Sequence, residues 1–316
     1  SAAPRERLGA DPGFEARMRL VLGRAYESLQ EFGLAEREYR RTVDAVATLP
    51  EAERTTPLYQ AYNGLGRAAM RDARSDEARR HLERVVELTE GDSGALELHA
   101  AALANLASVH DQLFGAAGRA AALEYNARAM RGFDALYGHD ALRRFAIRLQ
   151  RAQLLSGDER YAMPADLRAA FEITSGLLPR LDAALGADDL TALRVRLLHH
   201  RLQSWLGQHA AAVSGLRALQ PQAERLLGVN DLYVLNSRRV LCYALAQRGE
   251  VDAGLAELEA AIAGFLQRYG EQHPNLATTR FDQAVVLLRA GRRDEARAAM
   301  QDAERDYLVR EPELEA

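Results

Sequence analysis

The chain has 316 residues, of which 48% are hydrophobic and 27% are charged, and its formal net charge is −4. This composition is typical of a folded domain and not of a disordered chain. No apolar run approaches the length of about 18 residues that a membrane span needs, and no basic stripe is present. We therefore expect neither direct membrane insertion nor nucleic-acid binding.

The chain contains no lysine, so all 41 basic residues are arginine. This excludes P-loop nucleotide binding, protein-kinase chemistry and Schiff-base catalysis, since each of them needs a lysine. The single cysteine, Cys242, excludes an internal disulfide and a cysteine-rich metal site. A nucleophilic thiol would need a base partner that the sequence does not show, so we expect Cys242 to be buried and inert.

The first two segments, 11–49 and 57–90, each predict a pair of amphipathic helices joined by a short turn. Apolar residues recur at i, i+4 and i+7 in both halves of each segment. Small residues also stand twelve positions apart on the consecutive helices: Gly23 and Ala35, then Gly66 and Ala78. Side chains this small let the two helices of a pair approach closely.

The next two segments, 94–136 and 139–185, predict less regular helix pairs. The stretch "FGAAG" inserts residues into the first of them, and the turn-rich stretch "SGDERYAMPADL" interrupts the second. We expect the pair at 139–185 to be the most irregular of the chain.

The last three segments, 189–226, 231–269 and 274–309, again predict regular pairs. His200 and Gly254 depart from the pattern of small residues, so we expect looser packing there. The final helix places Ala296, Met300, Ala303 and Tyr307 on one apolar stripe with charged residues elsewhere. This helix is expected to end the array with its own polar face.

The junctions between pairs share a spacing of 42 residues, seen at Gly186, Gly228 and Gly270. Glycine suits the position after a helix, where φ is positive. Three residues after each glycine stand Asp189, Asp231 and His273, and Asp140 follows Gly138 in a fourth copy. Aspartate is a favoured N-cap, and Pro274 suits a first helical turn. We therefore interpret His273 as an N-cap, with a chemical role in a loop as the alternative.

The combination of "LG…Y…A" spacing within each pair and the "LGxxHP" or "LGxxD" junctions resembles the tetratricopeptide repeat, and the 42-residue period resembles its kinesin-light-chain type. The resemblance covers nearly the whole chain. It implies an all-α fold, a right-handed α-solenoid of about seven helix pairs that forms a single domain over residues 1–316. Stacked neighbours form the core of such an array because one pair cannot bury its own apolar face.

The resemblance also implies a concave groove, lined by the first helix of each pair, that binds peptides or protein segments. Carried over by position, the groove residues are Arg24, Glu27, Asn63, Arg67, Arg71, Arg194, Arg201, Trp205, Asn236, Arg239, Tyr243 and Gln247. Asparagine can bond a peptide backbone as donor and acceptor, and arginine can hold a carboxylate with two hydrogen bonds. We therefore expect an acidic or carboxylate-bearing partner. The alternatives are that these arginines only solvate a lysine-free surface and that Trp205 belongs to the core.

Other chemistry is not indicated. His199 and His200 are adjacent, so they cannot form the i, i+4 pair of helical zinc sites. The carboxylates alternate with arginines on helix faces, a pattern typical of solvated surfaces. We expect no catalytic residue, no metal and no cofactor. An enzyme with a site in the irregular region 139–183 is the remote alternative.

The most specific function that these patterns favour is the ligand-sensing or partner-binding part of a bacterial signal-transduction protein. The opening sequence is similar to repeat regions of bacterial receptor Ser/Thr kinases and membrane-bound winged-helix regulators. It has no signal peptide and reads like the interior of a longer chain, so we expect an excised domain. A free cytosolic adaptor is the alternative. The sequence does not distinguish the periplasmic side of a membrane-anchored parent from the cytoplasm, and a second copy of the chain is a further candidate partner.

Overall fold

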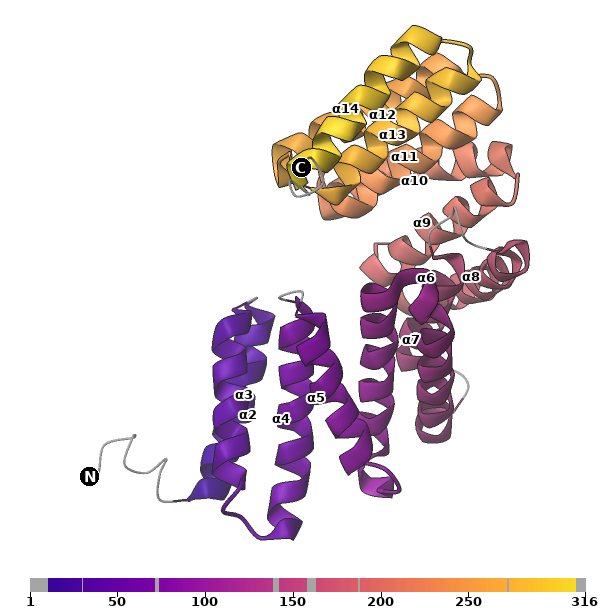
Figure 1. The fold of residues 1–316 in the computed structure, drawn as a ribbon. Coiled ribbons are helices and arrows are strands. Elements are labelled where there is room, and N and C mark those ends of the chain that lie inside the picture. Colours follow the sequence, from indigo (N-terminus) through magenta and orange to yellow (C-terminus); the bar gives the residue numbers. More distant parts are fainter. Residues whose placement is uncertain are drawn as a thin grey trace. The chain divides into compact units, whose positions relative to one another are not determined.

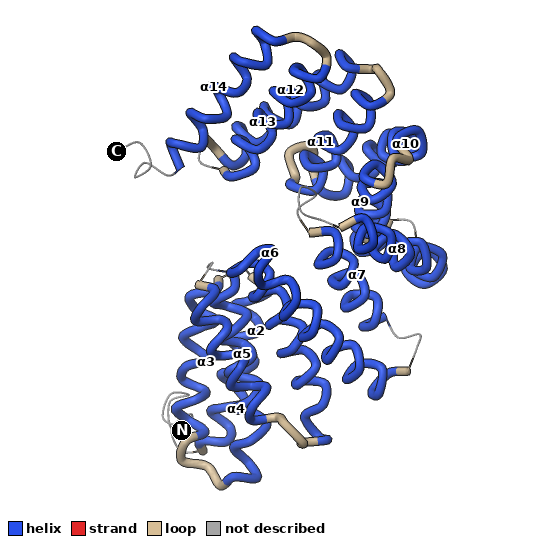
Figure 2. The backbone as a smooth tube through the Cα atoms, turned by 45° about the vertical axis from the view of Figure 1, so that its right-hand side comes forward, coloured by secondary structure: helices blue, strands red, loops and turns tan. Residues whose placement is uncertain are grey.

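The computed structural model describes residues 11–29, 31–71, 74–138, 142–157, 163–186, 188–271 and 273–310. These residues form helices joined by short connections, and no strand occurs in the described ranges (Figure 2). The chain divides into two compact units, unit 1 (residues 1–161) and unit 2 (residues 162–316). The all-α fold predicted from the sequence is confirmed.

Unit 1 is a stack of helices in which each one packs against the next. Its α-helices, labelled in Figure 1, are α2 (Pro12–Ser28), α3 (Phe32–Val46), α4 (Glu51–Arg71), α5 (Ser75–Leu88), α6 (Leu96–Tyr137) and α7 (Leu142–Ser156). A short 3₁₀ helix, η1 (Ser93–Ala95), precedes α6. α4 also contacts both α2 and α6. The first helices of successive pairs therefore lie beside one another.

Helix α6 folds back on itself. If its 42 residues were straight, Ala100 and Gly132 would lie ~48 Å apart at a rise of about 1.5 Å per residue. Instead, a Cβ added at Gly132 would lie 2.8 Å from the Cβ of Ala100. The rings of His110 and Tyr125 also lie only 5.0 Å apart. The backbone thus turns between His110 and Tyr125, and the two arms pack antiparallel as an irregular helix pair.

Polar side chains connect α7 to both arms of α6 by hydrogen bonds. Asn126, which is fully buried, donates to the carbonyl of Ile147 at 3.1 Å and to the side chain of Gln150 at 2.9 Å. Gln150 in turn donates to the carbonyl of Ala104 and to the hydroxyl of Ser108, each at 2.8 Å. Buried amides need such partners, so these polar groups of the irregular region serve packing.

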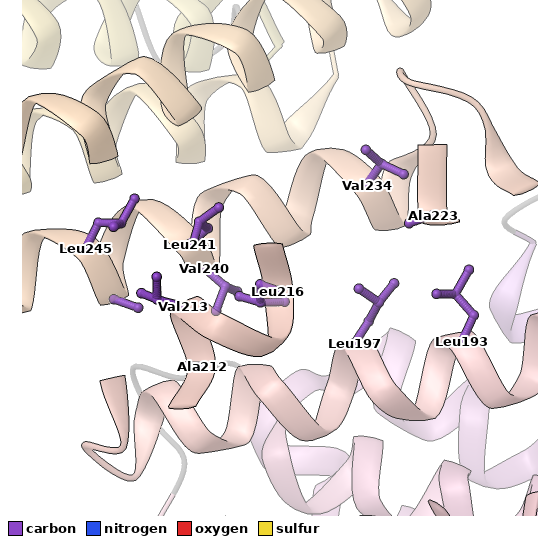
Figure 3. Packing of buried hydrophobic residues seen from close by; sticks show 11 residues of the cluster. Leu193, Leu197, Ala212, Val213, Leu216, Ala223, Val234, Val240, Leu241 and Leu245 are labelled. Carbon is purple, nitrogen blue, oxygen red and sulfur yellow. The ribbon is translucent and has the colours of Figure 1, made fainter. Parts of the chain in front are cut away.

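Unit 2 begins with α8 (Pro164–Leu185), so the expected pair at 139–185 is divided, with α7 in unit 1 and α8 in unit 2. The other helices are α9 (Leu190–Trp205), α10 (His209–Leu227), α11 (Leu232–Gln247), α12 (Val251–Tyr269), α13 (Pro274–Arg289) and α14 (Arg293–Arg310). Figure 3 shows one aliphatic core of unit 2, to which α9 contributes Leu193 and Leu197, α10 contributes Leu216, and α11 contributes Leu241 and Leu245. Whether residues 1–316 form one continuous solenoid stays a prediction.

Glycine ends the helices of unit 2 at intervals of 21 residues. Gly186, Gly228 and Gly270 stand between pairs, and Gly207, Gly249 and Gly291 stand within pairs; all six have φ between 78° and 94°. Only glycine adopts this region without strain. The glycines between pairs were predicted from the sequence, whereas the glycines within pairs were not.

His273 is the N-cap of α13, as predicted. Its Nδ1 accepts the backbone N–H of Asn275 at 3.3 Å, as the Asp231 carboxylate accepts that of Tyr233 at 2.9 Å. Burial lowers the pKa of His273, which favours the neutral imidazole that can accept this bond. Asp189 caps α9 in the same way, whereas Asp140 lies outside the described residues.

The expectation of loose packing at His200 and Gly254 is wrong. A Cβ added at Gly215 would lie 2.1 Å from the His200 ring, so a glycine on α10 makes room for the larger side chain. A Cβ at Gly254 would lie 2.9 Å from the carbonyl oxygen of Cys242. On α14, Ala296 and Ala303 are buried as expected, but Met300 and Tyr307 are exposed.

Candidate functional site

A groove of about 580 Å³ lies in unit 1 and is lined by residues of α2, α4, η1 and the start of α6. Three of the predicted site residues, Arg24, Asn63 and Arg67, line it together. The other lining residues were not predicted from the sequence; they are Thr56, Tyr59, Gln60, Asp92, Gly94, Ala95, Glu97, Leu98 and Ala101. Arg71 is exposed at the end of α4 and is not among the lining residues.

Arg24 is the exposed cation of this groove. Its guanidinium donates to the side-chain oxygen of Gln60 at 2.9 Å, which joins α2 to α4. Within the described residues no carboxylate forms an ion pair with it. A neutral amide leaves the charge of Arg24 uncompensated, so this side chain can take a carboxylate from a ligand.

Arg67 already holds a carboxylate of its own chain. Its Nε and Nη2 donate to the two oxygens of Glu27 at 3.0 and 2.6 Å. The buried hydroxyl of Tyr39 donates to the same carboxylate at 2.5 Å. Burial works to lower the pKa of Arg67, but the hydrogen bonds and the charge of Glu27 outweigh it and raise that pKa. A ligand carboxylate would therefore have to displace Glu27 from Arg67.

Two glycines make room for the ring of Tyr39. A Cβ added at Gly23 or Gly64 would lie 2.5 Å from the ring of Tyr39. Both helices thus approach the ring through glycine, and its hydroxyl reaches Glu27. Burial, followed by the hydrogen bond and charge of Glu27, raises the pKa of Tyr39, so the hydroxyl stays a donor.

Asn63 lies on the floor of the groove and is 95% buried, with 5% of its surface exposed. Its side-chain oxygen accepts from the amide of Asn105 at 3.4 Å. Asn105 stands 42 residues later, so it is the equivalent position of the next repeat. The 42-residue spacing was the signal that could have identified it.

In unit 2 two of the predicted arginines lie against aromatic rings. The guanidinium of Arg194 lies 4.9 Å from the ring centre of Tyr233, and that of Arg201 lies 4.8 Å from the ring centre of Trp205. Both arrangements are cation–π contacts. Trp205 is partly buried, so it is neither a core residue nor a fully exposed anchor.

The predicted residues of α11 also have partners within unit 2. Arg239 donates to one oxygen of Asp282 on α13 at 2.9 and 2.6 Å, and to the side-chain oxygen of Asn236 at 3.1 Å. Tyr243 lies edge-on to His209, with 5.9 Å between ring centres. Arg239 therefore links neighbouring first helices in unit 2, as Arg67 does in unit 1.

Burial shifts the pKa values of two further candidate residues, Cys242 and His199, toward their neutral forms. Burial raises the pKa of the Cys242 thiol to about 12, with Asp282 and Glu257 adding to the effect. Burial also lowers the pKa of His199 to about 4, with His200 contributing. In the described part of the chain no three potential ligands gather around a possible metal position. None of the helices in the described ranges combines the length and apolarity that a bilayer span requires.

Residues 233–308, which cover nearly all of the last two helix pairs, match the family model of the tetratricopeptide repeat. The chain has a tetratricopeptide-repeat fold. A comparison with curated protein sequences gives no match.

Solved structures resemble between 67% and 95% of the chain. A putative kinesin light chain from Podospora anserina with nearly identical TPR-like repeats matches with a TM-score of 0.51 at 16% identity, over 67% of this chain and 97% of its own. The apo quorum sensor NprR from B. thuringiensis matches with 0.60 at 10% identity, over 92% and 87%. A Rap protein in complex with Competence and Sporulation Factor matches with 0.55 at 13% identity, over 95% and 97%. At these identities the likeness concerns the fold.

Proposed function

We propose that the chain is a non-catalytic binding module, and that the groove of unit 1 holds an extended peptide or protein segment bearing a carboxylate. The observation that carries this proposal is Arg24, an exposed cation at a groove with no carboxylate partner in the described residues. The amides of Gln60 and Asn63 lie beside it and suit a peptide backbone. The Rap protein solved with Competence and Sporulation Factor supports the use of such a fold for ligand binding.

In this proposal, Glu27 limits the affinity of the groove for a ligand carboxylate. It occupies Arg67 with two charge-assisted hydrogen bonds, so an entering carboxylate meets Arg24 first and competes with Glu27 for Arg67. The second predicted set, which consists of Arg194, Arg201, Trp205, Asn236, Arg239 and Tyr243, is proposed as a separate contact surface of unit 2. Its stacked arginines suit a planar or acidic group.

We further propose that this binding serves ligand sensing in a bacterial signal-transduction protein. The likeness to the quorum sensor NprR supports this role. The likeness to a kinesin light chain supports the alternative of a free adaptor that joins two proteins. A ligand of a few residues favours the sensor, and a long segment of another folded protein favours the adaptor.

The test is selection of displayed peptides on the whole chain, with an Arg24→Ala/Gln60→Ala variant used for counter-selection. Peptides that survive should carry a carboxylate, and calorimetry should show about tenfold weaker binding to the variant, as expected for the loss of one charge-assisted contact. Glu27→Gln should tighten the same peptides, because it releases Arg67. Arg297→Ala, on the exposed face of α14, is the matched control and should change nothing. Peptides without carboxylates that bind wild type and variant equally would refute the groove as the site.

A further inference from the structure

The outer face of α2 is apolar and exposed. Its side chains Phe14, Met18, Val21, Leu22 and Leu29 are between 38% and 70% exposed, and Ala25 among them is exposed as well. At about 100° per residue these positions fall within a stripe roughly 100° wide. The stripe lies opposite the buried side of the helix, which is formed by Gly13, Ala16, Leu20 and Gly23. A solvated helix carries polar residues on such a face.

Two segments of the given sequence, residues 1–10 and 311–316, do not match this stripe. Residues 1–10 contain one large apolar residue, Leu8, and residues 311–316 contain one, Leu314. Neither segment has the repeated apolar spacing of a helix that could cover α2. An exposed apolar patch of this kind marks an interaction surface.

Charge on the rim of the stripe indicates what covers it. Arg17 and Arg24 stand seven residues apart on one edge, and both are exposed. Within the described residues neither forms an ion pair with a carboxylate. Arg19, near the opposite edge, is by contrast neutralised by Glu15 and Glu38 at 2.6 and 2.8 Å. Unlike Arg19, the two arginines on the Arg17 edge are not neutralised by ion pairs in the described part of the chain.

We propose that the outer face of α2 docks an amphipathic helix of another protein, with carboxylates along the edge that meets Arg17 and Arg24. Apolar side chains of that helix cover the stripe, and its acidic edge supplies the charge that the α2 rim lacks. A second copy of this chain fits less well. In a two-fold antiparallel pair of α2 helices, the Arg17 edge of one copy would face the Arg17 edge of the other, and like charges repel.

The test uses two synthetic helical peptides as probes, each with leucine at i, i+3 or i+4, and i+7. One carries glutamate along one edge of the leucine stripe, and the other carries lysine at the same positions. Fluorescence anisotropy with the whole chain should show binding of the glutamate peptide, weakened at least about tenfold by Val21→Ser/Leu22→Ser. Leu288→Ser removes a side chain on α13 that is as exposed as Val21, both at 58%, and should have no effect.

A substitution at Arg17 tests this surface without changing the groove, because Arg17 does not line the groove. Arg17→Glu should weaken the glutamate peptide about threefold, tighten the lysine peptide, and leave peptides selected for the groove unaffected. Circular dichroism should show all variants folded. Equal binding of both peptides, or equal binding to wild type and Val21→Ser/Leu22→Ser, would overturn the proposal. So would a dimer in sedimentation velocity that the same double variant abolishes, since the occupant would then be a second copy.

Discussion

The two units differ in how regularly their helices are connected. Unit 2 turns at a glycine every 21 residues, and aliphatic side chains fill its cores. Unit 1 shows no such period in its described residues, and polar side chains such as Glu27 with Arg67 and Asn126 with Gln150 cross between its helices beside its own hydrophobic cores. The groove lies in unit 1, the less regular of the two. A regular glycine period thus produces uniform pairs, whereas side-chain hydrogen bonding accommodates an irregular pair and leaves polar groups at the surface.

The largest expected effect comes from burying a charge in either unit. Ala78→Glu in unit 1 and Ala212→Glu in unit 2 each replace a fully buried alanine and should lower the free energy of unfolding by ~3–5 kcal/mol. Ala298→Glu, at an exposed position of α14, is the control. Urea unfolding followed by circular dichroism reports on both units, and fluorescence of Trp205, the single tryptophan, reports on unit 2. An unchanged midpoint for either buried variant would show that the helix register of that unit is wrong.

Acidification should weaken unit 2 through His199. Its ring stacks on Phe171 with 4.6 Å between ring centres, and burial lowers its folded-state pKa from 6.5 to about 4. The unfolded chain then binds more protons than the folded one, so this stability is complete above about pH 6.5 and is lost as the pH falls toward 4. The expected loss is ~2–3 kcal/mol. Urea unfolding at several pH values should show a smaller loss for His199→Gln, and identical pH profiles would contradict the assignment.

Replacing a glycine by alanine should lower the stability of unit 2 at a turn and raise it within a helix. Gly249, with φ of 85°, ends α11, and Gly249→Ala should destabilise unit 2 by ~1–2 kcal/mol because alanine resists this conformation. Gly176 lies inside α8 with nothing within 4 Å of an added Cβ. Gly176→Ala should therefore stabilise by ~0.5–1 kcal/mol. Thermal melting of the two variants compares them directly, and equal shifts would mean that the 21-residue period has no energetic role.

The smallest expected effect is at the cap of α13. His273→Asp supplies the carboxylate that Asp231 supplies to α11 and should change stability by only a few tenths of a kcal/mol, whereas His273→Ala should cost ~1 kcal/mol. Chemical denaturation near neutral pH measures both. A loss of ligand binding by a folded His273→Asp variant would instead revive a chemical role for the imidazole.

The helix pairs, the junction glycines and the cap residues could be predicted because each depends on nearby sequence. Asp189, Asp231 and His273 cap helices that begin directly after them, and burial of Ala78 and Ala212 follows from their repeat positions. The sequence could not predict which groove arginines already hold a carboxylate of the chain. Arg67 and Arg239 meet Glu27 and Asp282 across 40 and 43 residues, and a face pattern does not say which side chains pair across it.

The sequence by itself determined the repeat, its 42-residue period and three of the residues that line the groove, Arg24, Asn63 and Arg67, since hydrophobic spacing and turn chemistry are local. Only the tertiary structure decided that α6 folds back with Gly132 against Ala100, and that His200 is accommodated by Gly215. It also decided that Arg24, and not Arg67, is the groove cation without a carboxylate, and that the apolar side of α2 is exposed. These features depend on close packing and on pairing between helices far apart in the chain, where a difference of one side chain changes which contacts form.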